Sequence, residues 1–151
     1  MNEKLIGNNW QARKVENNYI VIFDDKAEIK DVLMDFISNR GIKKGHFSGI
    51  GFLKNAVLNC FDSITGKYTD KEFKGLIIAF DIFGSILQLE NQISIDLRMT
   101  FKFNDEIFYD NHLLKGKVYE KIEMIFYSAD TQKVIFTNKI SLPDINDFSY
   151  N

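Results

Sequence analysis

The clearest pattern in the chain is a strict alternation of apolar and polar positions from Ile93 to Phe103. Every odd position in this stretch is apolar, and every even position, from Ser94 to Lys102, is polar. A period of two that lasts for eleven residues predicts a β-strand with one face on the core. The polar face of this strand carries Asp96 and Arg98, whose side chains point to the same side because they are two residues apart.

A hairpin and a helix are predicted before this strand. Trp10–Val15 and Tyr19–Phe23 are apolar-rich segments on either side of Glu16-Asn17-Asn18, which predicts a β-hairpin. A helix is predicted from about Lys26 to Arg40, because its apolar residues fall on one stripe, namely Ile29, Leu33, Phe36 and Ile37.

The two ends of this helix have candidate capping residues. Asp25 and Glu28 have the spacing of a capping box at the start of the helix. Gly41 directly follows the last helical residue and is expected to be the C-terminal cap.

Most of the remaining chain is predicted to be β-strand. Residues 41–62 contain four glycines in a strand-like sequence, and glycines there allow a bulge or a close approach of the backbone. Two further strands are expected at Gly75–Phe83, ended by Gly84-Ser85, and at Lys117–Tyr127. We expect residues 110–116 to form a turn-rich loop.

These elements define a fold class and a domain. The connections between the strands are short, which favours antiparallel pairing. We therefore predict an α+β domain with a large, mostly antiparallel sheet of about seven or eight strands, flanked by helices. The domain is expected to occupy residues 10–136, with a short last strand at Val134–Phe136. It would lie between a loose N-terminus at 1–9 and a C-terminal tail at 137–151.

Composition restricts the class of protein further. The net charge is −2 and the basic residues are scattered among acidic ones, whereas a nucleic-acid-binding protein usually has a basic excess or stripe. The single cysteine, Cys60, cannot form a disulfide within the chain. Neither a signal peptide nor an apolar run of membrane-spanning length is recognisable, so we expect a cytoplasmic protein without a membrane partner.

Isolated motifs do not indicate a reaction. Gly49-Ile50-Gly51 lacks the third glycine of a dinucleotide-binding fingerprint, because position 54 is Lys54. His46 lies in a strand-like stretch, where a structural or exposed role is favoured over a catalytic one. Cys60 alternates in phase with Leu58 and is expected to behave as a small hydrophobic residue.

The order of several short segments resembles the plants and prokaryotes conserved (PPC) domain. The resemblance covers roughly residues 10–136 and rests on Arg40-Gly41-Ile42, GHFSGIGFLKNAVLNCFD at 45–62, Thr65–Tyr68, IAFDIFGSI at 78–86, Ile93–Thr100 and His112-Leu113-Leu114 followed by Gly116. It implies a sheet flanked by helices and a homotrimer. Prokaryotic members are often described as DNA-binding, but Ile42 replaces the last arginine of the Arg-Gly-Arg AT-hook found in plant members.

The resemblance also implies a candidate site. Many prokaryotic members have His-x-His on the strand that matches Ile93–Phe103 and a Gly-Gly-His-Leu loop after it, which together resemble a transition-metal site. In this chain Asp96 and Arg98 occupy the two strand positions, and His112 is retained. Asp110-Asn111 replaces the glycine pair, and both residue types tolerate positive φ.

Arg98 changes the chemistry expected at this site, because an arginine stays protonated and cannot bind a metal. Our hypothesis is that no cofactor is used and that Arg98 supplies the positive charge, with Asp96 and Glu120 as counter-ions. Three alternatives stay open: a solvated surface pair of Asp96 and Arg98, a metal-free anion pocket using Arg98 and His112, and a surviving metal site that includes Asp96 and His112.

We predict a non-enzymatic, self-assembling homotrimeric domain that binds a small anionic ligand or a protein partner. One alternative is a metabolite-binding enzyme that uses a cleft around Asp96, Arg98 and His112. The other is a DNA-binding regulator with a basic face, formed by Arg98, Lys102, Lys115, Lys117 and Lys121.

Overall fold

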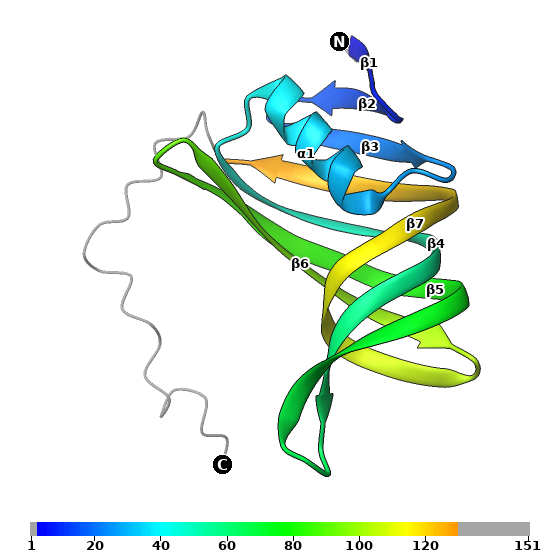
Figure 1. Ribbon diagram of the computed structural model, residues 1–151. Helices are drawn as coiled ribbons and strands as arrows, with labels where there is room; N and C mark the ends of the chain where they lie inside the picture. Colours follow the sequence, from blue (N-terminus) through cyan, green and yellow to red (C-terminus); the bar gives the residue numbers. More distant parts are fainter. Residues whose placement is uncertain (1–2, 130–151) are drawn as a thin grey trace, which may run out of the picture.

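The computed structural model describes residues 3–129, which form one antiparallel β-sheet and a helix (Figure 1). The elements are β1 (Glu3–Gly7), β2 (Trp10–Val15), β3 (Asn18–Asp24), α1 (Ile29–Arg40), β4 (Lys44–Asp62), β5 (Lys67–Leu89), β6 (Gln92–Phe103) and β7 (Glu106–Ser128). The sheet order is β1-β2-β3-β7-β4-β5-β6, and β7 pairs with β6 as well. No helix in this part of the chain is long and apolar enough to cross a membrane.

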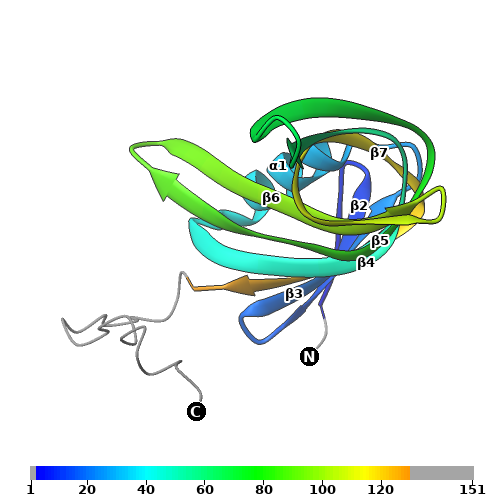
Figure 2. The ribbon, with the colours of Figure 1, turned by 90° about the horizontal axis from the view of Figure 1, so that it is seen from below.

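The extra pairing of β6 with β7 closes one end of the sheet on itself. Residues 112–128 of β7 pair with β4, and the remaining pairings of β7 are with β6 at residues 106–112 and with β3 at residues 121–127. Strands β4 to β7 therefore curl into a ring, which Figure 2 shows from below. This closure places His112 of β7 directly beside Arg98 of β6.

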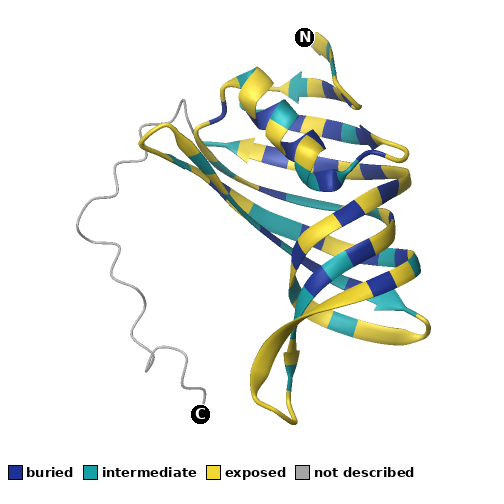
Figure 3. Cartoon of the chain, viewed as in Figure 1, coloured by how far each residue is buried: buried dark blue, intermediate teal, exposed yellow. Residues whose placement is uncertain are grey.

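Helix α1 covers one face of the open part of the sheet. Its buried residues are Ile29, Val32, Leu33, Phe36 and Ile37, as the stripe in the sequence predicts. The Phe36 ring packs against Trp10, Tyr19 and Phe126, with centroid distances of 5.0, 5.3 and 4.6 Å. Burial alternates along the strands (Figure 3), so each strand buries one side under the helix or inside the ring.

Several predicted elements are confirmed. The strand at Ile93–Phe103 is β6, and the predicted hairpin is formed by β2 and β3. Gly41 ends the helix in the left-handed conformation, at φ 62°. A register irregularity falls between Gly49 and Gly51 of β4, where the glycines predicted a bulge or close approach.

Three other predictions about elements are wrong. In the described residues the sheet is flanked by one helix rather than by several. The N-terminal stretch is not loose throughout, because Glu3–Gly7 pairs with β2. Residues 110–116 form no loop and belong to β7. The predicted strand at Val134–Phe136 and the tail at 137–151 lie outside the described residues.

The predicted break at Gly84-Ser85 does not occur, because β5 continues to Leu89. A Cβ atom at Gly84 would collide with the backbone oxygen of Asp96 and contact the Phe47 ring. Glycine therefore permits a close approach of β5 and β6 at this position instead of ending the strand.

The predicted capping box is also wrong, because the carboxylates of Asp25 and Glu28 accept hydrogen bonds from the backbone of β7 and not from that of the helix. Glu28 is the N-cap residue but makes no side-chain capping bond, and it accepts the backbone N–H of Gly116 at 2.7 Å. Asp25 accepts the backbone N–H of Glu120 at 2.8 Å. The segment before α1 is thus fixed to a strand almost a hundred residues away in the chain, which spacing alone does not reveal.

Replacing Glu28 with glutamine is expected to stabilise the protein at neutral pH. Burial raises the pKa of Glu28 above its ordinary value of 4.5, and this outweighs the hydrogen bond from Gly116, which lowers it. The folded state therefore binds the proton more tightly than the unfolded state. This contribution to stability is present at low pH and is lost as the pH rises through the raised pKa.

Glutamine keeps an oxygen that accepts the Gly116 N–H but does not ionise. Thermal unfolding measured from acidic to neutral pH should show a flatter pH dependence for Glu28→Gln than for the wild type. Glu72→Gln, at an exposed position of β5, serves as the control. An unchanged pH dependence in Glu28→Gln would contradict this assignment.

Candidate functional site

The three candidate residues lie together on β6 and β7. Arg98 and His112 are directly paired across the two strands, and Asp96 lies two residues from Arg98. The Nε atom of Arg98 lies 3.2 Å from Oδ2 of Asp96. The Nδ1 atom of His112 lies 3.3 Å from Oδ1 of the same carboxylate. Asp96 therefore sits between the two nitrogen-containing side chains.

The second counter-ion of Arg98 is Asp110 rather than Glu120. Oδ1 of Asp110 lies 3.4 Å from Nη1 of Arg98. Asp110 has a left-handed backbone at φ 51°, and its N–H donates to Oγ1 of Thr100 at 3.1 Å. Glu120 lies at a different irregular position of β7, at φ 63°, where its N–H binds Asp25. The glycine-like conformation expected at residue 110 thus brings a carboxylate to the site.

An open cavity of about 420 Å³ borders this cluster. It is lined by Asn59, Tyr68, Arg98, Asp110 and His112. Asn59 and Tyr68 come from the β4–β5 hairpin, and Asn59 pairs with His112 across β4 and β7. The Nδ2 atom of Asn59 donates to Oδ1 of Asp70 at 2.9 Å, which orients the amide. Neither hairpin residue was predictable as part of the site, because no motif links them to the alternating strand.

The charge of Arg98 is fixed by its two carboxylate neighbours. Asp96 raises the pKa of the guanidinium most, and Asp110 raises it further. The side chains of Arg98 and Asp96 are 37% and 41% exposed, so water and salt screen these pairs. Arg98 itself is therefore permanently charged, but its ion pairs add little to stability.

The residues present do not fit a metal ion. In residues 3–129 no group of three His, Cys, Asp or Glu side chains is placed to hold one. A guanidinium has no lone pair to donate and would repel a cation beside it. The metal site that the resemblance implies therefore has no ligand set among the described residues of this chain.

The site lies at one end of the sheet face that α1 does not cover. One row of directly paired residues crosses the sheet from β3 through β7, β4 and β5 to β6. Its members, in that order, are Ile20, Ile125, Ser48, Phe83 and Arg98. Paired residues point to the same side of a sheet, so this row marks the uncovered face. We call it the helix-free face; Tyr19 and Val21, the neighbours of Ile20, point to the other side and are buried.

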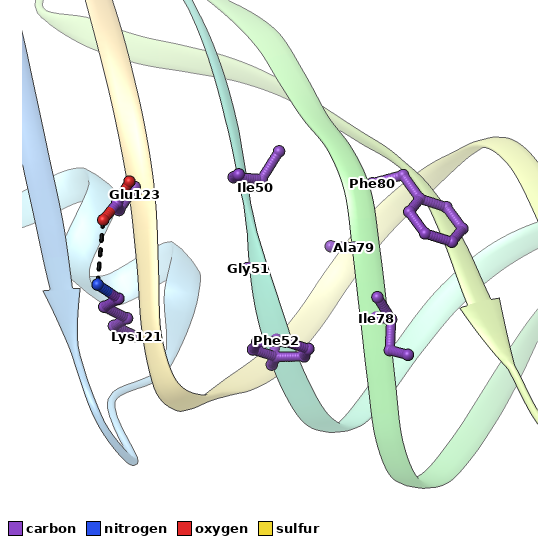
Figure 4. Close-up of a pocket in the computed structure, with 8 residues that line it drawn as sticks. All are labelled: Ile50, Gly51, Phe52, Ile78, Ala79, Phe80, Lys121 and Glu123. Carbon is purple, nitrogen blue, oxygen red and sulfur yellow. Dashed lines mark hydrogen bonds and ion pairs between the residues drawn. The ribbon is translucent and has the colours of Figure 1, made fainter.

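The middle of the helix-free face is apolar and exposed. A cavity of about 380 Å³ there is lined mainly by Ile50, Gly51 and Phe52 of β4 and by Ile78, Ala79 and Phe80 of β5 (Figure 4). Lys121 and Glu123 form an ion pair of 3.1 Å at its border. Exposed apolar side chains clustered in this way are typical of interaction surfaces.

The other candidates from the sequence have structural surroundings. The His46 ring stacks on Tyr127 at a centroid distance of 4.7 Å. Burial raises the pKa of the Cys60 thiol, which disfavours the reactive thiolate. Three residues of the predicted basic face have carboxylate partners, since Lys102 pairs with Asp105 and Lys121 with Glu123, as Arg98 does with Asp96.

Comparison with known proteins gives a consistent result. The model of the family described as the Plants and Prokaryotes Conserved (PCC) domain, also called PPC, matches residues 11–130. A protein of Bacteroides thetaiotaomicron, named as a candidate DNA-binding protein, is 26% identical, with 83% of this chain and 87% of that chain covered, at a TM-score of 0.74. No protein with a curated description matches the chain.

Two archaeal structures share the fold at lower identity. A metal-containing protein of Archaeoglobus fulgidus is 19% identical over 76% of this chain and 81% of that chain, with a TM-score of 0.64. A plant- and prokaryote-conserved (PPC) protein of Pyrococcus horikoshii is 18% identical over 82% of this chain and 84% of that chain, with a TM-score of 0.64.

Proposed function

Because this chain belongs to the Plants and Prokaryotes Conserved (PCC) domain family, we propose that it is a homotrimeric, non-enzymatic domain of the cytoplasm that binds a small ligand or a protein partner. The observation that carries the proposal is the apolar middle of the helix-free face. Ile50 and Phe80 are exposed there, next to the cavity between β4 and β5. Covering such a surface with another copy of the chain would remove apolar area from water.

The ligand site lies at the border of this proposed interface. Arg98 and the exposed Ile125 belong to the same cross-strand row of the helix-free face. A second chain that covers the middle of the face would therefore approach the cavity beside Arg98. We propose that Arg98 takes the place of the metal in relatives with His-x-His, and that an anionic group of the ligand pairs with it.

Replacing Ile50 with lysine is expected to dissociate the trimer into monomers. Ile50 is 58% exposed in the isolated chain, so a lysine is tolerated in the monomer. In an interface the same ammonium would lose its hydration beside Glu123, a carboxylate that already pairs with Lys121, and this loss of solvation costs several kcal/mol. Light scattering coupled to size-exclusion chromatography measures the mass in solution.

The matched control is Ile6→Lys, because Ile6 is 73% exposed on the edge strand β1. This variant should stay trimeric, and circular dichroism should show both variants folded. A monomeric wild-type protein at micromolar concentration would overturn the proposed assembly. Equal masses for the wild type and the Ile50→Lys variant would show that the interface lies elsewhere.

DNA binding is a second candidate, favoured by the name of the Bacteroides thetaiotaomicron relative. The carboxylates beside Arg98, Lys102 and Lys121 argue against a DNA interface there, because a polyanion needs a row of unpaired cations, whereas a small ligand needs only the remaining donors of one guanidinium. Binding of the trimer to duplex DNA at low salt, lost steeply as salt rises, would establish this function in place of the ligand-binding one.

A further inference from the structure

The geometry around Arg98 points to a zwitterionic ligand, a small molecule with both an ammonium and a carboxylate group. This inference rests on the proposed ligand site and specifies the chemistry that it recognises. The cluster contains two carboxylates, Asp96 and Asp110, and one guanidinium. A simple anion that approaches Arg98 therefore also meets the negative charges of Asp96 and Asp110, which repel it.

Arg98 still has donors for a ligand carboxylate. Its Nε binds Asp96 and its Nη1 binds Asp110, and no hydrogen bond to Nη2 is found among the described residues. A guanidinium carries five N–H donors, two of them on Nη2. Both belong to a side chain that lines the open cavity, and they are available to bind a carboxylate oxygen.

Asp110 and Tyr68 provide a place for the ammonium group. The carboxylate of Asp110 contacts Nη1 of Arg98 only at 3.4 and 3.5 Å, so it keeps acceptor capacity for a second cation. Tyr68 is exposed, lines the same cavity and packs against Phe61 at a centroid distance of 5.1 Å. An ammonium near this ring gains a cation–π contact in addition to the charge of Asp110.

The cavity favours a short ligand with separated charges. Its volume is about 420 Å³, and Arg98 and Asp110 both belong to its lining. The guanidinium of Arg98 and the carboxylate of Asp110 already contact each other through Nη1. The two charged groups of the ligand must therefore bind the donors and acceptors that this contact leaves available. A short ω-amino acid satisfies this requirement, because a few methylene groups separate its two charges.

Titration of the full-length protein with 4-aminobutyrate, butyrate and butylamine tests the inference. The three probes share a four-carbon chain and differ in whether they carry both charges or one. Amide chemical shifts of ¹⁵N-labelled protein should move saturably near residues 96–98 and 110–112 with 4-aminobutyrate. Butyrate and butylamine, at the same concentration and ionic strength, should bind at least about tenfold more weakly.

Asp110→Asn is the discriminating variant, because asparagine tolerates the left-handed backbone at this position. It should weaken binding of 4-aminobutyrate by about tenfold and strengthen binding of butyrate, since one guanidinium would then face one carboxylate. Arg98→Leu should abolish binding of 4-aminobutyrate.

Each contrary result is informative. Equal binding of butyrate and 4-aminobutyrate to the wild type would overturn the zwitterion but leave the proposed anion site intact. Equal binding of butylamine would exclude both, and so would the absence of binding by all three probes. Light scattering on the same samples reports the assembly separately, so failure of the proposed homotrimer is distinguishable from failure of the ligand assignment.

Discussion

Replacing Phe36 with alanine is expected to lower the free energy of unfolding by about 3–5 kcal/mol. Phe36 is fully buried where α1 meets the sheet, and its ring contacts Trp10, Tyr19 and Phe126. Alanine would leave a cavity bordered by three large rings held on separate strands, which can close only in part. Urea unfolding followed by tryptophan fluorescence measures the loss, since Trp10 is the only tryptophan.

Two comparisons show whether packing at this point causes the effect. Phe36→Leu keeps most of the buried volume and should cost clearly less than the alanine variant. Met34→Ala, on the outer side of the same helix with the methionine 40% exposed, should change stability by about 1 kcal/mol or less. A loss in Phe36→Ala no larger than that in Met34→Ala would show that α1 does not anchor the sheet.

The parts of the fold that follow from local sequence were predictable. The alternation from Ile93 to Phe103 depends only on which side chains face the core, and β6 follows it. The stripe that contains Phe36 likewise fixed which side of α1 is buried. Gly41 was predictable because a left-handed cap has a residue preference of its own.

The parts that depend on distant contacts were not predictable. Glu28 and Asp25 have the spacing of a capping box, but the backbone of β7 takes both carboxylates as acceptors. Gly84 resembles a strand break, yet its missing side chain lets Asp96 approach. The partners of Glu28 and Asp25 lie 88 and 95 residues away in the chain, and the partner of Gly84 lies on the next strand. Single-sequence patterns contain no record of these contacts.

The residues of the candidate site were likewise predictable only in part. Asp96, Arg98 and His112 could be named because the order of motifs resembles one family, and the structure brings these three side chains together. Asp110 was considered only as a replacement for glycine, although the same conformation directs its carboxylate to Arg98. Tyr68 was missed because it reaches the cavity from a hairpin whose position depends on the closed sheet.

Replacing Arg98 with histidine is expected to create a zinc site. The carboxylate of Asp96 and the imidazole of His112 already approach within 3.3 Å, and position 98 lies directly across from His112. An imidazole introduced there would complete a set of three protein ligands, to which zinc adds a water molecule. The substitution also removes the positive charge that repels a metal ion. Calorimetric titration of tag-free protein should give about one zinc ion per chain.

Matched variants separate the new ligand from the lost charge. Arg98→Leu removes the guanidinium without adding a ligand and should not bind zinc stoichiometrically, and Arg98→Lys should not either, because it keeps a cation at the site. Stoichiometric zinc in the wild type would contradict the proposal that Arg98 replaces the metal. If neither Arg98→His nor the double variant Asp96→His/Arg98→His bound zinc, residues 96, 98 and 112 would not converge on one ion. The charge of Arg98 could then no longer be understood as the counterpart of a metal.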